Sequence, residues 1–475
     1  MSEQALLIPE FPDRQPSERY QVTVEGRPVQ VHQTPACHFA LFQGFGEVDV
    51  RVAVSEPFET CKIRPGRLGL EPKRLGEQLL NIRLSLPCKV TLEFDGNLKT
   101  PLFLLCSPMP ASMPECVPES MPASMSECIP ENLSENIPEI LPGCMQENTP
   151  EPDADLIRFG PGFHEAGEIL LYSGQTLLLE SGAWVHGRIR MDGGENIRIC
   201  GSGILDASNP AILNDRDTRS ERHHAILPTR CRDIRIEGIT VLGAPTWHVV
   251  PVACESVQIQ GLNIIGHLGT GDGIDLVGCR DVTVSDCFVR VKDDCVAIKA
   301  VDYQFPFGEV DVARVTVERC VFWNDTWGNV MEIGYETRCA EIHDIVFRDI
   351  DVVHCEYEGW QSGGVFTIHN GDRADIHDIL YENIRVECAD EKLIDFKILD
   401  SRYSKDKQRG RIRNVVLRDI SVMDGPFPMS VLRGWEAEQM VENIRIERLT
   451  ILGNPVRNWR EARMLLEITK DIVFV

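Results

Sequence analysis

Nine segments in the C-terminal part of the chain repeat one short pattern, and this repeat constrains the fold more than any other feature. Examples are ENIRICGSGIL from Glu195, RDVTVSDCFVRV from Arg280 and HDIVFRDIDVV from His343. Each is two short alternating strands with a polar or glycine-containing bend between them. The equivalent apolar positions are Ile197, Ile234, Val257, Val282, Val315, Ile345, Ile379, Val415 and Ile444. The steps between them are 37, 23, 25, 33, 30, 34, 36 and 29 residues, as expected for one unit with insertions of different lengths.

A repeat of this length, made of strands without intervening helices, predicts a solenoid. The alternatives are a parallel β-helix, a propeller and a leucine-rich horseshoe, and the sequence lacks both the Trp-Asp blade signature and the leucine-rich consensus. We therefore expect an all-β parallel β-helix, in which each strand stacks on its equivalent one coil earlier, about 4.8 Å away. Loops on one face of such a solenoid commonly form its binding groove.

The repeat accounts for residues 156–475, and two other segments precede it. Short alternating runs such as YQVTV and CKVTLEF in residues 1–106 predict a small antiparallel sandwich, which either packs as a cap on the solenoid or binds carbohydrate. Residues 107–155 are rich in Pro, Glu and Met, with an apolar residue at every fourth position and no Lys or Arg. Frequent proline prevents a continuous helix or sheet, so we expect a linker or surface insertion, with an interaction tail as the alternative.

Composition excludes several classes of partner. The formal net charge of −25 over 475 residues would repel nucleic acid and anionic membranes, and no stretch is long enough to span a bilayer. The start, MSEQALLIPEF, lacks the basic and apolar regions of an export signal, so we expect a cytoplasmic protein. Its 17 Cys show no metal-type spacing and mostly interrupt apolar strands, which predicts reduced thiols and neither a metal nor a cofactor.

The segment VKDDCVAIK, residues 291–299, places two acids inside an apolar strand pattern. Large apolar residues occupy odd positions before Asp293 and Asp294 and even positions after them, which indicates a bend or bulge that turns both carboxylates outward. Asp272, in TGDGIDLVGC, precedes Asp293 by 21 residues, close to one short coil. The three acids should therefore lie on neighbouring coils.

Three neighbouring carboxylates raise one another's pKa, which prepares one of them to act as an acid near neutral pH. Hydrolysis of a glycosidic bond needs this division between a protonated carboxyl and a carboxylate that activates water or attacks carbon. The structural alternative is that these residues are turn or capping aspartates, as Asp beside Gly often is.

The acid motifs resemble those of the polygalacturonase-like glycoside hydrolases of family 28, to which the dextranase-type family 49 is a related neighbour. GDGID (271–275), KDDCVAIK (292–299) and GNVMEIG (328–334) carry the resemblance, which runs from about Phe159 to the C-terminus. It implies a right-handed parallel β-helix and hydrolysis with inversion. It also implies that Asp293 is the general acid and that Asp272 and Asp294 hold the attacking water.

Two departures from the family pattern bear on the substrate. The family has a histidine where this chain has Asn329, and an Arg-Ile-Lys motif where this chain has GVFTIH, residues 364–369. A cationic clamp suits the carboxylate of a uronic acid. The substrate is therefore either a polygalacturonan-like carbohydrate or a neutral glycan, as in the dextranase-type relatives.

Further residues near the predicted bends are candidates for substrate binding, each with packing as its alternative. They are Asn329, Glu332, Lys299, Trp247, His248 and His369, with Trp323, Trp327, Trp360 and Asp275 as supporting candidates. A polysaccharide lyase and a non-catalytic glycan-binding solenoid remain the alternative functions. The missing cationic base argues against the lyase.

Overall fold

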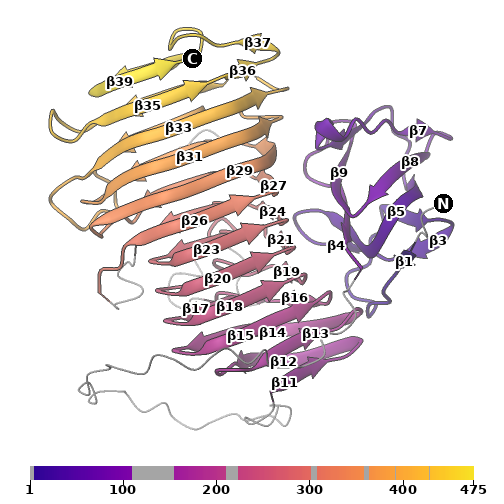
Figure 1. Cartoon of the computed structure of the whole chain (residues 1–475). Coiled ribbons are helices and arrows are strands. Elements are labelled where there is room, and N and C mark those ends of the chain that lie inside the picture. Colours follow the sequence, from indigo (N-terminus) through magenta and orange to yellow (C-terminus); the bar gives the residue numbers. More distant parts are fainter. Residues whose placement is uncertain are drawn as a thin grey trace.

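The computed structural model describes residues 5–109, 155–209, 223–300, 308–357, 363–390, 392–426 and 428–475. Strands account for nearly all of its secondary structure, with one short 3-10 helix at Gly66–Leu68. Figure 1 shows a tall stack of coils with a smaller domain against one side. Over these ranges no helix is long and apolar enough to cross a membrane.

The N-terminal domain is built around one long strand, β5 (His38–Val54), which takes part in two layers. The first half of β5 pairs with β4 and β10, and the second half pairs with β2 and β8. An apolar core lies within the domain. Its other strands are β1 (Ala5–Leu7), β2 (Tyr20–Val24), β3 (Arg27–Val29), β4 (Val31–Gln33), β6 (Cys61–Arg64), β7 (Lys73–Arg74), β8 (Leu79–Leu86), β9 (Cys88–Phe94) and β10 (Leu102–Ser107).

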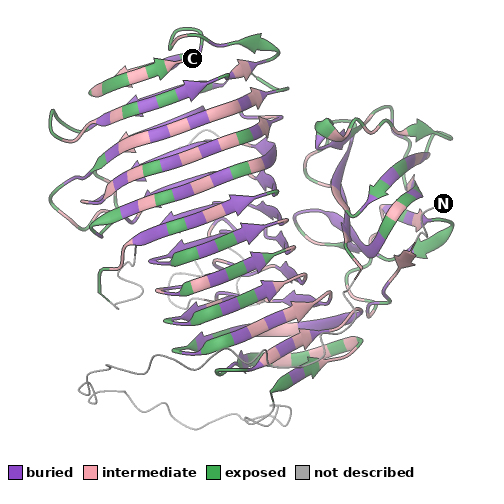
Figure 2. Cartoon of the chain, in the orientation of Figure 1, coloured by how far each residue is buried: buried purple, intermediate pink, exposed green. Residues whose placement is uncertain are grey.

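The C-terminal domain is a right-handed parallel β-helix whose coils contribute to three sheets, here called front, side and back. The first coils are β11 (Leu156–Phe159), β12 (Gly162–Leu170), β13 (Thr176–Leu179) and β14 (Ala183–Asp192). The front sheet then contains β15 (Glu195–Gly201), β18 (Arg232–Glu237), β20 (Glu255–Gln260), β23 (Arg280–Ser285), β26 (Val312–Glu318), β29 (Glu341–Cys355), β31 (Asp375–Val386), β33 (Arg411–Val422), β35 (Val441–Glu447) and β39 (Thr469–Phe474). Figure 2 shows buried and exposed residues alternating along these front strands, because one side of each faces the coil interior.

The side sheet is continuous with the front sheet, and the back sheet is separate. The side sheet contains β16 (Ile204–Asp206), β19 (Thr240–Leu242), β21 (Asn263–Ile265), β24 (Phe288–Val291), β27 (Val321–Asn324), the second halves of β29, β31 and β33, and β36 (Thr450–Ile451), which pairs with β37 (Asn454–Pro455). The back sheet contains β22 (Ile274–Val277), β25 (Val296–Lys299), β28 (Met331–Tyr335), β30 (Phe366–Asn370), β32 (Lys392–Ile398), β34 (Met429–Arg433) and β38 (Met464–Glu467), and β17 (Ile226–Thr229) extends it through isolated bridges.

The register confirms the repeat inferred from the sequence. Each of the nine apolar positions from Ile197 to Ile444 pairs with its equivalent in the next coil. The residue before each adopts a positive φ of 53–60°, and it is Asp or Asn in seven of the nine repeats, such as Asp281 and Asn414. Asp and Asn tolerate this left-handed conformation better than most residues do, which explains the recurring Asp-Ile and Asn-Ile pairs.

The N-terminal domain packs against the side sheet rather than against an end of the coil (Figure 1). Phe103 lies 4.9 Å from Phe288, ring centre to ring centre, within a buried apolar cluster formed by both domains. Lys89 donates hydrogen bonds to backbone carbonyls of two neighbouring coils, including 2.6 Å to that of Asp286. Arg64 is 2.6 Å from Glu387 across the same interface. The domain therefore covers an apolar side of the solenoid.

Two further sequence expectations concern the segment 107–155 and the cysteines. The predicted insertion at 107–155 lies outside the described residues, apart from 107–109 and 155. All described cysteines are free thiols, and most are buried. Their burial agrees with the expectation that they pack as small apolar residues, and their reduced state stays a prediction.

Candidate active site

The paired acids lie at a corner between two strands, not inside one strand. β24 ends at Val291 and β25 begins at Val296, so Asp293 and Asp294 occupy the turn from the side sheet to the back sheet. Val291 before the turn and Val296 after it both face the core, which confirms the predicted change of phase. Asp293 is half-buried at this corner, whereas Asp294 is only 7% exposed.

The register of the back sheet places the site residues on successive coils. Ile274 pairs with Val296, and Val296 pairs with Met331. Asp272, Asp294 and Asn329 each stand two residues before one of these core positions, so they are equivalent residues on three successive coils. The expectation that the acids lie on neighbouring coils is confirmed.

Asn329 and Gly328 hold the acid turn in place. The backbone N–H and the side-chain amide of Asn329 donate to Oδ1 of Asp294, at 2.7 and 3.0 Å. A Cβ atom at Gly328 would lie 2.3 Å from the backbone carbon of Asp293, so only glycine fits against the turn. Asn329, a predicted substrate ligand, is thus engaged with Asp294.

Lys299 pairs with the acids from the far end of β25. Its Nζ lies 3.0 Å from Oδ2 of Asp272 and 2.8 Å from Oδ1 of Asp275, and 4.0 Å from the ring centre of Trp247. Trp247 also stacks on His224. Burial opposes the charge of Lys299, but the carboxylates of Asp272 and Asp275 prevail and raise its pKa well above the usual value. The lysine therefore remains a cation, and Trp247 helps to hold it over the acids.

The buried acids ionise with difficulty. Burial, and then the neighbouring carboxylate of Asp275, raises the pKa of Asp272 well above its usual value. Burial likewise raises the pKa of Asp294, with the carboxylates of Asp272 and Asp293 adding to the effect. The pKa of Asp275 is raised to about 7 by burial, against the opposing effect of Lys299. The cluster can therefore hold and exchange protons near neutral pH.

His248 contacts the backbone of Asp272 and does not reach the surface. It is fully buried, its Nδ1 is 2.7 Å from the backbone carbonyl of Asp272, and its Nε2 accepts from the N–H of Ala244 at 3.3 Å. Burial lowers the pKa of His248 to about 4, which keeps the ring neutral. A neighbouring backbone group occupies each ring nitrogen, and the role of His248 in binding substrate stays a prediction.

Glu332 and His369 form a second buried group with Asp395. Nδ1 of His369 is 2.9 Å from both carboxylate oxygens of Glu332, and Nε2 is 3.3 Å from Asp395. Burial opposes protonation of His369, but the two carboxylates raise its pKa to about 9. Glu332 and His369 are both fully buried, and their role in binding substrate stays a prediction.

Sequence reasoning missed the groups that surround His369. Tyr335 stacks on it at 4.4 Å, and Tyr403 lies 5.6 Å from Tyr335. Lys392 and Lys397, from the next coil, approach Asp395 at 3.5 and 2.8 Å. β30 pairs with β32 in a register that puts Lys397 opposite His369. The two lysines therefore lie one coil beyond the position of the family's Arg-Ile-Lys motif. This register is the signal that could have located them.

The remaining tryptophans differ in their surroundings. Trp323 is fully buried in the interface with the N-terminal domain, so it is not at the site. Trp327 lies against Lys292, 4.9 Å from ring centre to Nζ, beside the acid turn. Trp360 falls outside the described residues. Among the described residues, no group of three or more His, Cys, Asp or Glu is arranged to hold a metal ion.

Comparison with solved structures identifies the fold. Dex49A from Penicillium minioluteum superposes with a TM-score of 0.63 at 16% identity, covering 94% of this chain and 92% of that chain. A hyperthermoactive exopolygalacturonase from Thermotoga maritima superposes with a TM-score of 0.52 at 17% identity, covering 67% of this chain and 84% of that chain. Both likenesses show the right-handed parallel β-helix.

Comparison of sequences identifies the family. A Vitis vinifera protein described as a probable polygalacturonase is 30% identical over 132 residues, and the match spans only about a quarter of each protein, 26%. The model of glycosyl hydrolases family 28 matches residues 184–425, more than half of the 475 residues and a range that includes all the acids described above. The chain therefore belongs to glycosyl hydrolases family 28.

Proposed function

We propose that this glycoside hydrolase cleaves its carbohydrate substrate with inversion, with Asp293 as the general acid and Asp272 and Asp294 holding the attacking water. The observation that carries the proposal is the register of β22, β25 and β28. It brings Asp272 and Asp294 to equivalent positions on adjacent coils, with Asp293 beside them at the corner.

The two proposed roles match the different surroundings of the acids. Asp293 is the more exposed carboxyl of the turn, so it can reach a leaving oxygen and regain a proton from solvent. Asp294 receives two hydrogen bonds from Asn329, and Asp272 receives one from Lys299. Hydrogen bonds of this kind favour the ionised form that a base needs, against the opposing effect of burial.

A neutral glycan is the second candidate substrate, beside a polygalacturonan. Lys299 and His369, two buried cations near the acids, are already paired with protein carboxylates. A uronate would need a cation that it does not have to share. This pairing favours an uncharged sugar at the acids.

The experiment is a reducing-end assay over neutral and uronate oligosaccharides, with Asp293→Asn, Asp272→Asn and Asp294→Asn compared with wild type. We expect each variant to lose at least about 100-fold in kcat, in line with the usual contribution of a general acid or base. Asp281→Asn, at a surface ion pair with Arg314, is the matched control and should retain activity.

Proton NMR of the first product formed tests the stereochemistry. Release of the anomer opposite to that of the substrate supports inversion, and release of the same anomer would contradict it. Unsaturated product would indicate a lyase instead. Binding of sugar without any release of reducing ends would indicate a non-catalytic solenoid.

A further inference from the structure

A segment on the outer side of the back sheet brings Tyr403 against Tyr335 of β28. It comprises residues 399–410, between the end of β32 and the start of β33, and is called here the return segment. The Tyr403 ring lies 5.6 Å from that of Tyr335, which stacks on His369. Burial raises the pKa of Tyr403 against the opposing effect of Arg402, with the carboxylates of Asp293 and Glu336 adding more weakly to the rise.

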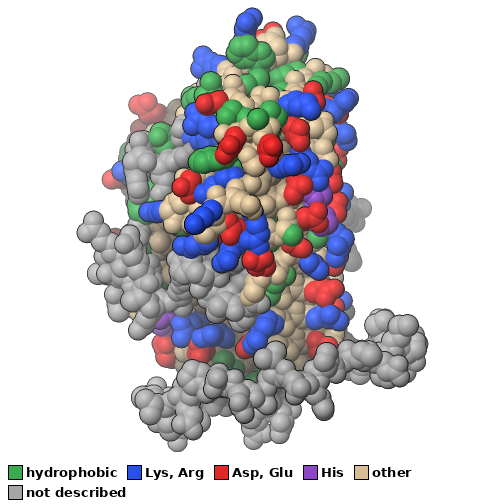
Figure 3. All heavy atoms as spheres, turned by 90° about the vertical axis from the view of Figure 1, so that its left-hand side faces the viewer, with side chains coloured by type: hydrophobic (Ala, Val, Ile, Leu, Met, Phe, Trp, Pro, Cys, Tyr) green, Lys and Arg blue, Asp and Glu red, His purple; other side chains and the backbone are tan. Residues whose placement is uncertain are grey.

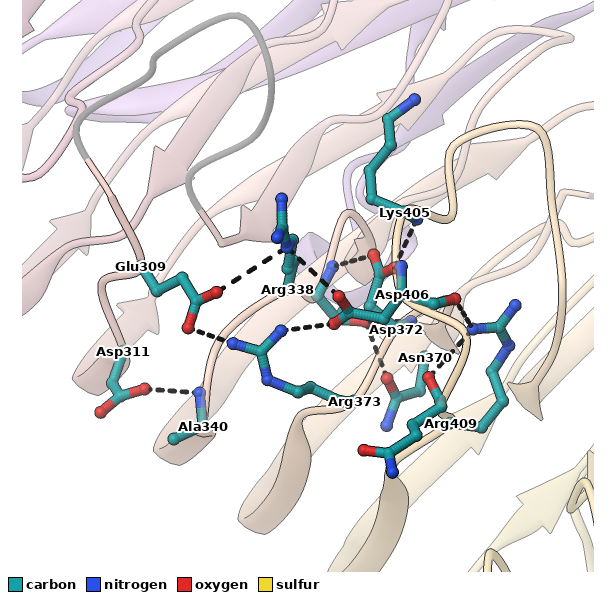
Figure 4. Close-up of polar contacts among 12 residues, drawn as sticks. Glu309, Asp311, Arg338, Ala340, Asn370, Asp372, Arg373, Lys405, Asp406 and Arg409 are labelled. Carbon is teal, nitrogen blue, oxygen red and sulfur yellow. Dashed lines mark hydrogen bonds and ion pairs between the residues drawn. The ribbon is translucent and has the colours of Figure 1, made fainter.

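One buried carboxylate anchors the return segment to the previous coil. Asp372 is 1% exposed, and its Oδ1 accepts hydrogen bonds from the backbone N–H of Lys405 at 2.6 Å and of Asp406 at 2.7 Å. Its Oδ2 faces the N–H of Thr337 at 3.4 Å. The backbone carbonyl of Asp372 also accepts from the N–H of Gly410 at 2.8 Å. Figure 4 shows Asp372 at the centre of this group.

Ion pairs form a second layer around the anchor. Asp406 lies 2.7 Å from Arg373 and 3.2 Å from Arg338, and both arginines also contact Glu309 (Figure 4). Arg338 follows β28 and Arg373 follows β30, so Asp406 ties the segment directly to two coils. Basic and acidic side chains intermingle over the edge where the front strands begin (Figure 3). Ion pairs in such surroundings are partly exposed, so they hold the segment less firmly than the buried carboxylate does.

We propose that Asp372 is a positioning residue that fixes the return segment, and with it Tyr403 against Tyr335, on the side of the coil where substrate binds. The expected effect of Asp372 on catalysis rests on the proposed hydrolase function. Asp372 itself touches neither the acids nor Tyr403 in the contacts described above. Its loss leaves the amides of Lys405 and Asp406 without their acceptor, and the segment then samples positions in which Tyr403 leaves Tyr335.

The first arm of the test follows the segment without any substrate. Hydrogen exchange by mass spectrometry is measured on the full chain for wild type, Asp372→Ala and Asp372→Asn. We expect peptides covering Lys405 and Asp406 to exchange at least about tenfold faster in Asp372→Ala, because local opening exposes these amides. Asp372→Asn should lie between the two, since its amide oxygen still accepts. Unchanged exchange in Asp372→Ala would overturn the anchor.

Asp375→Asn is the matched control for both arms. Asp375 is a neighbouring carboxylate that pairs with Arg413 at 3.0 Å and makes no contact with the return segment among the described interactions. It should leave exchange in the segment and the kinetic constants unchanged. A loss in this control as large as in Asp372→Ala would overturn the specific role of Asp372.

The second arm measures kcat and KM on whichever neutral or galacturonate oligosaccharide the wild type hydrolyses. We expect KM to rise about tenfold or more in Asp372→Ala, with kcat changed by less than about threefold, because the acids keep their places while the binding surface loosens. The shape of the pH profile should stay the same. An unchanged KM with a loosened segment would overturn the positioning role. Absence of hydrolysis by wild type would instead overturn the proposed function, while the exchange arm still decides the anchor.

Discussion

Replacing Lys299 by methionine removes a buried cation that lies 3.0 Å from Asp272 and 2.8 Å from Asp275. Methionine fills most of the volume of the lysine stem, so the change acts mainly through charge. The carboxylates then lose the partner that favours their ionised form, and their pKa values rise further above the usual range.

The size of this effect follows from the distances. At about 3 Å and an effective dielectric constant of about 20, Coulomb's law gives roughly 5 kcal/mol per pair, an upper limit that corresponds to a pKa change of about 4. Single neighbouring charges change measured pKa values by about 1–3, and we take this range as the expectation. Because Asp272 must lose its proton to act as a base, the acidic limb of the pH–rate profile moves upward by the same amount.

The assay is the pH dependence of kcat/KM for wild type and Lys299→Met. On the acidic limb the variant should lose activity by about tenfold for every pH unit by which the limb moves, and the loss should shrink as the pH rises above the new pKa. Lys392→Met is the matched control, since Lys392 is equally buried but pairs with Asp395 one coil beyond His369. An acidic limb that stays in place, or moves downward, would refute the assignment of Lys299 and Asp272.

Three further predictions address the turn and the domain interface. Asn329→Ala removes the side-chain hydrogen bond to Asp294 while the backbone N–H still donates, so the pKa of Asp294 should rise and the acidic limb of the pH–rate profile should move upward, while an unmoved limb would show that the amide plays no electrostatic part. Gly328→Ala places a Cβ atom against the backbone of the acid turn and should cost about 1–3 kcal/mol in denaturant unfolding, whereas Gly76→Ala, where the space is open, should change little. Phe103 is fully buried in the interface, so Phe103→Ala should lower the free energy of unfolding by about 3–5 kcal/mol. Phe45 is 43% exposed, and an equal loss in Phe45→Ala would contradict the role of Phe103 in the interface.

The fold could be predicted from the sequence because each coil carries its own local signal. The Asp or Asn in left-handed conformation before a core residue, as at Asp281 and Asn414, recurs in register and marks where each front strand begins. The position of the acid corner could also be predicted, because the apolar residues change from odd to even positions at Asp293 and Asp294 and this change requires the chain to turn. Strand-level patterns therefore indicated both the coil and the place of its acids.

The deeper part of the site could not be predicted in this way. Glu332 and His369 alternate with core residues and so point out of the coil, yet neighbouring coils and the tyrosines cover them completely. Lys397 and Tyr403 come from coils far along the chain, and their approach depends on the register and on the length of the return segment. Alternation within one strand tells which way a side chain points, but not what lies over it.

The interface between the two domains has a consequence for how such a chain can evolve and be produced. Phe103 and its neighbours cover an apolar strip on the side sheet, and Lys89 donates hydrogen bonds to backbone carbonyls beside it. A solenoid cut free of the sandwich would present that strip, with its open carbonyls, to other molecules. The two parts are therefore expected to be inherited together, and a recombinant fragment that begins at the first coil should be prone to aggregate.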